Sequence, residues 1–87
     1  MAKIEIYTSP FCGFCFSAKN LLGKKNAEFE ELDVMMHPKR KREMVARAGG
    51  QTSVPQIFID GEHIGGCDDL YALEASGMLD AKLAGAR

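Results

Sequence analysis

The order of its predicted secondary structure constrains the fold of this chain more than any other feature. Residues 3–7 alternate polar and apolar side chains, which is typical of a strand. Apolar residues then recur at helical spacing from residue 11 to about residue 25 and predict a helix with one apolar face. A less regular strand is expected over 29–34. A strand, a helix and a strand at this spacing predict a parallel pair joined by a right-handed crossover.

The second half of the chain predicts a helix and then a hairpin. Pro38 suits the first turn of a helix over residues 39–48, and Gly49-Gly50 suits its end. The apolar run over 56–59 is followed by Asp60-Gly61, a dipeptide typical of a two-residue hairpin turn. We therefore expect the last two strands to be antiparallel.

The C-terminal part of the chain predicts a last helix that starts near Leu70. Asp68 or Asp69 is well placed to cap its first turn. Gly77 interrupts the helical pattern, and residues 78–84 suit one or two more turns. The predicted order is β-α-β-α-β-β-α, which is an α/β fold with a four-stranded mixed sheet flanked by helices.

Length and composition fit a single folded domain. A chain of 87 residues leaves room for one domain, and we expect that domain to span residues 1–87. Apolar residues make up 46% of the chain and the net charge is -1, which argues against disorder and against a nucleic-acid partner. We find no apolar run of about 18 residues, and Glu5 breaks the apolar stretch that a signal peptide needs. We therefore expect a cytoplasmic protein without a membrane anchor.

Two of the three cysteines form the motif Cys12-Gly13-Phe14-Cys15 at the start of the first predicted helix. Both sulfurs fall on nearly the same side of the first turn, where free N–H groups and the helix dipole favour negative charge. The thiol pKa in such motifs is lowered to roughly 3.5–7.5. We predict that Cys12, the residue nearest the helix start, is the attacking thiolate and that Cys15 is the resolving thiol.

Two other interpretations of these cysteines have less support in the sequence. Buried cysteines are common in protein cores, which suits Cys15 in part but fits Cys12 poorly. A closed zinc site needs four ligands, and only Cys67, His37 and His63 remain as candidates beside the motif. We therefore expect no metal site. The pair in a chain with an odd cysteine count indicates redox chemistry rather than a disulfide scaffold.

Three motifs in this order resemble those of a glutaredoxin, most closely the small bacterial dithiol type. They are Cys12-Gly13-Phe14-Cys15, Ser53-Val54-Pro55 and Gly65-Gly66-Cys67-Asp68-Asp69. The resemblance covers nearly all of the chain. It implies a thioredoxin fold and glutathione as the source of reducing equivalents.

The resemblance also implies a glutathione site. A cis proline at Pro55 would present the backbone of Val54 to the cysteinyl part of glutathione. Backbone N–H groups of the segment Gly66-Cys67-Asp68 would hold the γ-glutamyl carboxylate, and the Asp68 carboxylate would meet the ammonium group. Cys67 would contribute its backbone rather than redox chemistry. The full set of implied glutathione-binding residues is Phe14, Lys41, Ser53, Val54, Pro55, Gly66, Cys67 and Asp68.

The basic run over residues 39–42 holds four of the eleven Lys and Arg residues. Most of it suits a solvated helix face. In related proteins a basic residue in this segment binds the glycine carboxylate of glutathione. Arg40 and Lys41 both align with that position.

Two departures from the family pattern concern the reactive thiol. Gly13-Phe14 stands where many dithiol glutaredoxins have Pro-Tyr, and the same Gly-Phe spacer occurs in monothiol relatives that carry an iron–sulfur cluster. Ser9 stands where relatives often have a lysine near the thiol. Without that charge, the helix terminus must supply more of the thiolate stabilisation.

The sequence therefore predicts a glutathione-dependent thiol–disulfide oxidoreductase that reduces protein–glutathione mixed disulfides and protein disulfides, acting as a monomer. The alternative is a module in which two copies bridge a [2Fe–2S] cluster through Cys12 and two glutathiones. The second cysteine, Cys15, favours catalysis because the cluster needs only Cys12. A thioredoxin-like carrier without glutathione is disfavoured by the segment Gly66-Cys67-Asp68.

Overall fold

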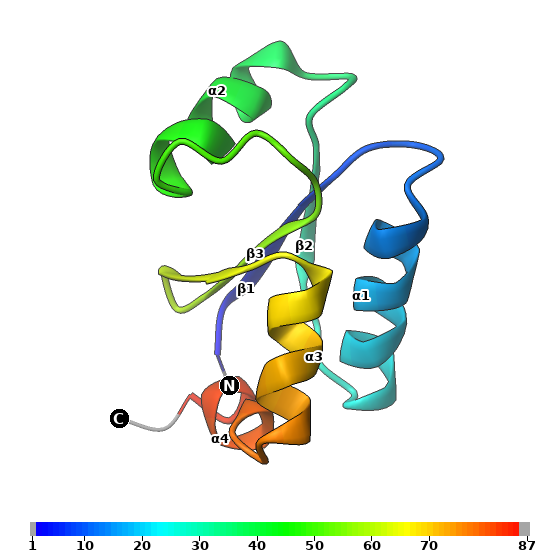
Figure 1. Ribbon diagram of the computed structural model, residues 1–87, viewed down its shortest axis with the longest axis vertical. Helices are drawn as coiled ribbons and strands as arrows, with labels where there is room; N and C mark the ends of the chain where they lie inside the picture. Colours follow the sequence, from blue (N-terminus) through cyan, green and yellow to red (C-terminus); the bar gives the residue numbers. More distant parts are fainter. Residues whose placement is uncertain (1, 86–87) are drawn as a thin grey trace.

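The computed structural model describes residues 2–85 and contains a four-stranded sheet between helices (Figure 1). The elements follow one another along the chain as β1 (Ile4–Thr8), α1 (Gly13–Lys24), β2 (Glu30–Asp33), α2 (Pro38–Arg47), β3 (Gln56–Ile59), β4 (Glu62–Gly65), α3 (Cys67–Ala75) and α4 (Leu79–Leu83). The predicted order is confirmed, with the last helical region divided into α3 and α4 near Gly77. Met1 and residues 86–87 of the expected domain lie outside the described residues. Among the described residues, the structure has no helix with the length and apolar character needed to cross a membrane.

The sheet is mixed, as the crossover and hairpin patterns predict. Its strand order is β2-β1-β3-β4. β1 pairs with β2 in parallel and with β3 antiparallel, and β3 pairs antiparallel with β4. Asp60 and Gly61 both have positive φ values, 52° and 82°, which is the backbone geometry of a type I′ hairpin turn.

Each face of the sheet has its own apolar core. Because side chains alternate along a strand, Ile4 and Ile6 of β1 point to one face and Tyr7 points to the other. The first face packs against α1, α3 and α4, and Figure 1 shows α1 and α3 side by side on it. The second face packs against α2 through Met44 and Ala48.

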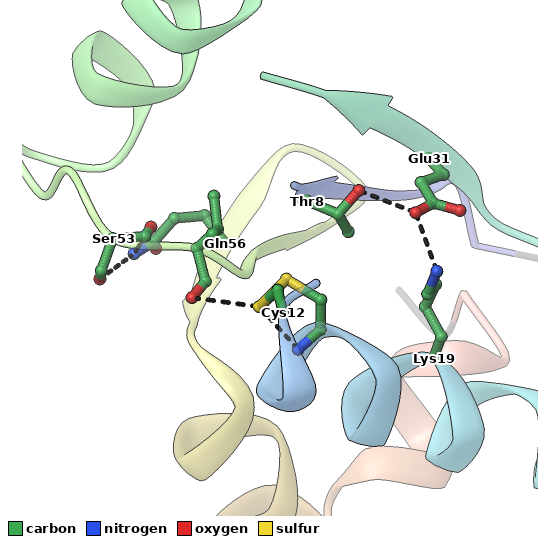
Figure 2. The surroundings of a disulfide bond; sticks show 8 residues. Thr8, Cys12, Lys19, Glu31, Ser53 and Gln56 are labelled. Carbon is green, nitrogen blue, oxygen red and sulfur yellow. Dashed lines mark hydrogen bonds and ion pairs between the residues drawn. A yellow bond between two sulfur atoms is a disulfide. The ribbon is translucent and has the colours of Figure 1, made fainter. Parts of the chain in front are cut away.

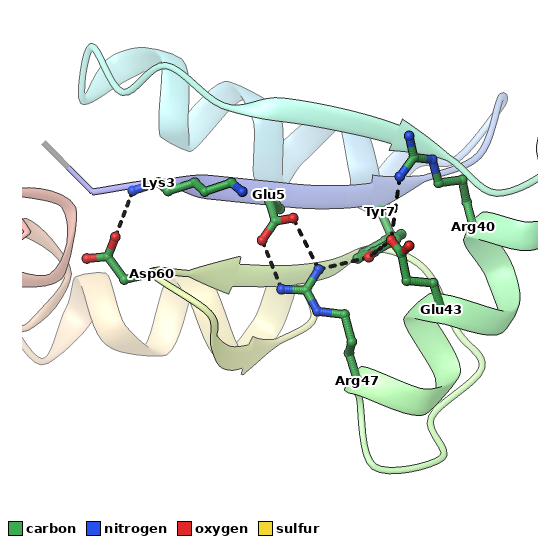
Figure 3. Close-up of polar contacts among 7 residues, drawn as sticks. All are labelled: Lys3, Glu5, Tyr7, Arg40, Glu43, Arg47 and Asp60. Atoms are coloured by element: carbon green, nitrogen blue, oxygen red, sulfur yellow. Dashed lines mark hydrogen bonds and ion pairs between the residues drawn. The ribbon is translucent and has the colours of Figure 1, made fainter.

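Helix α2 is also held to the sheet by polar contacts (Figure 3). The guanidinium of Arg47 donates to both carboxylate oxygens of Glu5, at 2.8 and 3.2 Å, and to the Tyr7 hydroxyl at 2.9 Å. It also lies over the Phe58 ring, 4.1 Å from the centroid. The Tyr7 hydroxyl donates to Glu43. The ion pair with Arg47 lowers the pKa of Glu5, so the pair stays charged at neutral pH.

The first helix begins two residues later than its periodicity suggests. Phe11 has a φ of 61° and Cys12 is extended, with φ -103° and ψ 105°, so neither has a helical backbone. The helix therefore starts at Gly13, and Cys12 becomes its N-cap residue. This difference decides where the reactive sulfur lies.

Candidate active site

The sulfur of Cys12 lies at the N-terminus of α1 and is bonded to the sulfur of Cys15 (Figure 2). The Cα atoms of the two residues are 5.2 Å apart. The backbone N–H of Cys15 donates to the Cys12 sulfur at 3.1 Å. Cys12 is partly exposed, whereas Cys15 is only 2% exposed. An incoming disulfide can therefore reach Cys12 but not Cys15, as expected for an attacking and a resolving thiol.

The helix terminus supplies the main positive potential at Cys12. No acidic residue occupies the first turn of α1, so nothing in that turn opposes a thiolate. Lys19 forms an ion pair with Glu31 at 2.9 Å, and Glu31 also accepts a hydrogen bond from Thr8 at 2.8 Å. The positive charge of Lys19 is therefore compensated locally. This arrangement fits the expectation from Ser9 that the helix N-terminus carries more of the stabilisation.

The loop before β3 forms the wall facing Cys12. The Val54–Pro55 peptide bond is cis, and the Val54 carbonyl oxygen lies 3.9 Å from the Cys12 sulfur. Among residues 2–85, the Val54 N–H donates to no partner. The backbone of Val54 is therefore free to pair with an extended peptide beside the sulfur.

The N-terminus of α3 forms a third side of the site. Gly66 is its N-cap residue, and the Asp69 carboxylate accepts a hydrogen bond from the Gly66 N–H at 2.9 Å. Within the described chain, the N–H groups of Cys67 and Asp68 have no acceptor. The last helix therefore begins at Cys67, earlier than the predicted start near Leu70, and neither Asp68 nor Asp69 is its N-cap residue. Asp69 lies at the third helical position, where its carboxylate makes the capping-box hydrogen bond with the Gly66 N–H, and the exposed Asp68 carboxylate is left for another partner. An anion can accept from the free N–H groups.

Gly65 makes this terminus sterically feasible. Its φ is 116°, and a Cβ atom there would lie 2.2 Å from Oδ2 of Asp69. Any side chain at position 65 would displace the Asp69 carboxylate and break its hydrogen bond with the Gly66 N–H.

These three sides enclose one cleft. Seven of the eight predicted glutathione-binding residues line it, namely Phe14, Ser53, Val54, Pro55, Gly66, Cys67 and Asp68. Three further lining residues were not predicted from the sequence, namely Gln51, Gln56 and Asp69. The cleft combines apolar surface, free backbone N–H groups and a carboxylate, which suits a small zwitterionic peptide.

Gln56 supports the loop side of the cleft from below. It is 1% exposed, and its amide nitrogen donates to the Gln51 side chain at 3.1 Å and to the Ser53 carbonyl at 3.1 Å. Its amide oxygen lies 2.7 Å from Nε2 of His63. A glutamine that precedes the apolar run Ile57-Phe58-Ile59 is the sequence signal that could have indicated such a buried polar group.

Comparison with known proteins agrees with this geometry. Residues 4–64 match the family model described as Glutaredoxin. The chain is 53% identical over 83 residues to Glutaredoxin 3 of Escherichia coli strain K12, an alignment that covers 95% of this chain and 99% of that protein. The chain belongs to the glutaredoxin family.

Solved glutaredoxin structures have the same fold. Glutaredoxin from Brucella melitensis superimposes with a TM-score of 0.86 at 48% identity, over 100% of this chain and 94% of that one. The buckwheat glutaredoxin–glutathione complex gives a TM-score of 0.88 at 25% identity, over 97% of this chain and 78% of that one. The predicted family and thioredoxin fold are confirmed. So is the enzyme class: the chain is a glutathione-dependent thiol–disulfide oxidoreductase with a Cys12–Cys15 pair.

The two basic candidates for glutathione lie on α2 and are not among the residues that line the cleft. Lys41 is exposed, and Arg40 is partly buried with its guanidinium 3.6 Å from the Glu43 carboxylate. A role of either residue in glutathione binding stays a prediction.

The third cysteine, Cys67, differs from Cys12 in the exposure and reactivity of its thiol. Cys67 is 8% exposed and is a lining residue of the cleft at the start of α3. Burial, and secondarily the charge of Asp68, raise the pKa of the Cys67 thiol above its ordinary value. The protonated thiol is a poor nucleophile, which fits the expected backbone role.

The remaining candidate metal ligands are dispersed. His37 is exposed at the start of α2, and His63 pairs with Gln56 on β4. Within residues 2–85 no three His, Cys, Asp or Glu side chains are grouped so that they could hold a metal ion.

Proposed function

We propose that this protein reduces protein–glutathione mixed disulfides and protein disulfides in the cytoplasm, as a monomer that binds glutathione in the cleft beside Cys12. One observation carries the proposal: the partly exposed Cys12 sulfur caps α1 and lies 3.9 Å from the Val54 carbonyl, at the edge of a cleft lined by the N-terminus of α3.

The first step is an exchange at the glutathione sulfur. The Cys12 thiolate attacks that sulfur, a Cys12–glutathione disulfide forms, and the protein–glutathione disulfide breaks. The protein thiolate leaves and takes a proton from solvent. A second glutathione thiolate then attacks the bound glutathione sulfur, which releases oxidised glutathione and restores the Cys12 thiolate.

The second cysteine opens a route for protein disulfides. Cys12 attacks one sulfur of the substrate and forms a mixed disulfide with the protein. Cys15 loses its proton and attacks the Cys12 sulfur, so the substrate leaves as a dithiol and a Cys12–Cys15 disulfide forms. Two glutathiones then reduce that disulfide and become oxidised glutathione.

The charges of the cleft support one orientation of glutathione. The free N–H groups of Cys67 and Asp68 suit the γ-glutamyl carboxylate, and the exposed Asp68 carboxylate suits the neighbouring ammonium. The Val54 backbone suits the cysteinyl part, which puts the glutathione sulfur beside Cys12. Lys41 or Arg40 then binds the glycine carboxylate.

The test is a steady-state assay of glutathione mixed-disulfide reduction, coupled to glutathione reductase and NADPH. We expect rapid turnover by the unmodified protein, none above background for Cys12→Ser, and retained turnover for Cys15→Ser on the monothiol route. Turnover that survives in Cys12→Ser but not in Cys15→Ser would reverse the assigned roles.

Negligible turnover by the unmodified dithiol protein would instead favour the cluster-binding alternative. In that case, anaerobic purification with glutathione should give a brown protein with visible absorption from a [2Fe–2S] cluster. Turnover with a colourless protein supports the oxidoreductase.

A further inference from the structure

Three of the five phenylalanines lie within six residues of one another and are exposed. Phe14 lines the glutathione cleft, but Phe11 and Phe16 do not. Phe11 is fully exposed and the exposed fraction of Phe16 is 64%. Large apolar side chains gathered on one part of a surface indicate an interaction site more often than isolated ones do. These two residues flank the reactive motif, and core packing does not explain why a phenylalanine stands at either position.

A second hollow lies beside the reactive sulfurs. Cys12 and Cys15 contribute to it, Phe11 and Phe16 are its large apolar residues, and none of its lining residues belongs to the glutathione cleft. Figure 2 shows Cys12 between Ser53 and Gln56 on one side and the group of Thr8, Glu31 and Lys19 on the other. The hollow is therefore on the side of Cys12 away from the cis-proline loop.

The charged residues of this hollow carry an excess of negative charge. The Glu31 carboxylate accepts hydrogen bonds from Lys19 at 2.9 Å and from Thr8 at 2.8 Å, and these contacts lower its pKa so that it stays ionised. Asp33 accepts from two backbone N–H groups, those of Met35 and Met36, and has no basic partner among the described residues. Lys19 therefore offsets only one of two carboxylates. An acidic segment would be repelled here and an apolar one would not.

The backbone presents Phe11 to solvent at a conformational cost. A φ of 61° is rare for a bulky side chain, because the left-handed region brings Cβ close to the backbone. Conformations of this kind persist where the surrounding structure imposes them, and they are concentrated at functional sites. Here the loop between β1 and α1 imposes it directly before the attacking cysteine.

We propose that Phe11 and Phe16 form a docking face for the protein half of a disulfide substrate and select segments that carry an apolar side chain near the reacting cysteine. The inference rests on the proposed function and names its substrate class. A mixed disulfide has two halves joined at the sulfur that Cys12 attacks. When glutathione fills the cleft, the protein half has to continue over surface outside the cleft, and Phe11 and Phe16 are the exposed aromatic residues that it can contact in the hollow on the other side of Cys12.

The experiment compares three substrates in the coupled assay. One is the mixed disulfide of glutathione and 2-hydroxyethanethiol, in which the half other than glutathione is not a peptide. The other two are glutathionylated peptides that differ only in carrying Leu or Glu two residues from the cysteine. Each is reduced by the unmodified protein, by the double variant Phe11→Ser/Phe16→Ser, and by the control Met78→Ser. Met78 is also more than half exposed but lies between α3 and α4.

We expect the unmodified protein to prefer the Leu peptide over the Glu peptide by about tenfold in kcat/KM, the discrimination typical of one apolar contact. The double variant should lose this preference and keep its rate on the small disulfide within about twofold. Met78→Ser should match the unmodified protein on all three substrates. The thermal midpoint of each variant shows that it is folded.

Two results would overturn the docking face. One is a double variant that retains the preference for the Leu peptide. The other is an equal loss on the peptides and on the small disulfide, which would mean that the rings shape the reactive site itself. Failure of the proposed function looks different, because the unmodified protein would then turn over none of the three substrates.

Discussion

The two sides of Cys12 are built in different ways. On the cis-proline side, the surface combines free backbone N–H groups, polar side chains and one aromatic ring, Phe14, and the buried Gln56 amide holds the loop through hydrogen bonds. On the other side, the surface includes the exposed aromatic rings of Phe11 and Phe16. A ligand with one constant structure, such as glutathione, can be bound by groups at fixed positions. Protein substrates that have only a cysteine in common are better bound by apolar side chains, which can contact segments of different sequence.

The support beneath the cleft also differs from that beneath the hollow. Gln56 is buried, and each of its amide atoms has a partner within 3.1 Å. In the polar group at the hollow, Thr8 is buried, but the side chains of Lys19 and Glu31 are 32% and 42% exposed. Buried networks are rigid because an unpartnered member is costly, whereas exposed pairs contribute little. We therefore expect substitutions on the cleft side to cost both binding and stability, and those on the hollow side to cost selectivity alone.

The largest of these structural effects is predicted for Gln56→Met. Methionine fills a similar volume but leaves the Gln51 side chain, the Ser53 carbonyl and the His63 ring without their partner. We expect the free energy of unfolding to fall by roughly 1–3 kcal/mol. We also expect KM for glutathione to rise several-fold with kcat less affected. Denaturant titration and glutathione kinetics measure the two effects.

Thr52→Ala is the matched control for that variant. Thr52 is exposed in the same loop and does not line the cleft. Both parameters should stay near those of the unmodified protein. An unchanged KM in Gln56→Met would show that the loop holds its position without the buried amide, which would break the contrast between the two sides.

A pair of variants at the N-terminus of α3 separates capping from recognition. Asp69→Ala removes the carboxylate that accepts from the Gly66 N–H, so we expect a loss of about 1 kcal/mol and a lower thermal midpoint. Asp68→Ala removes an exposed carboxylate, so we expect mainly a higher KM for glutathione. If Asp68→Ala instead lowered the midpoint as much as Asp69→Ala and left KM unchanged, the proposed ammonium contact would be wrong.

A smaller effect concerns the reactivity of the buried thiol on the cleft side. In the double variant Cys12→Ser/Cys15→Ser, Cys67 is the one remaining cysteine. Its pKa is raised, so less thiolate exists at any given pH than in a free thiol of pKa about 8.5. Alkylation by iodoacetamide should therefore be slow at pH 7 and accelerate only at a more alkaline pH than it does for free cysteine.

Adding Asp68→Ala sharpens that measurement. It removes the negative charge that contributes to the raised pKa, so the pH profile should shift toward neutral pH. If Cys67 in the Cys12→Ser/Cys15→Ser variant, with Asp68 intact, were alkylated with the same pH dependence as free cysteine, the buried, protonated state of its thiol would be contradicted.

The smallest expected effect is on the stability of the docking-face variants. Phe11→Ser and Phe16→Ser replace exposed rings, and such surface changes are usually within about 0.5 kcal/mol. The thermal midpoints should therefore match that of the unmodified protein. A loss well above this value would mean that the rings pack against the fold, and the contrast between a supported and an unsupported side would fail.

Much of the fold follows from local patterns in the chain. Alternation and helical spacing predict the order of strands and helices, because these periods reflect how side chains leave a strand or a helix. Asp60-Gly61 predicts the hairpin because both positions need positive φ. The Cys-x-x-Cys motif and its two companion motifs indicate the family. These features are local or can be recognised from motif order, so the sequence by itself determines them.

The tertiary structure decided what depends on contacts between distant residues. The start of α1 at Gly13, which makes Cys12 its N-cap, depends on how the loop from β1 turns. The 3.9 Å approach of Val54 to Cys12 joins residues 42 positions apart. The hydrogen bond from the Gly66 N–H to Asp69 rather than Asp68, and the burial of Gln56, depend on side-chain positions in three dimensions. Periodicity carries no information on such contacts, because they arise only when the sheet and helices pack together.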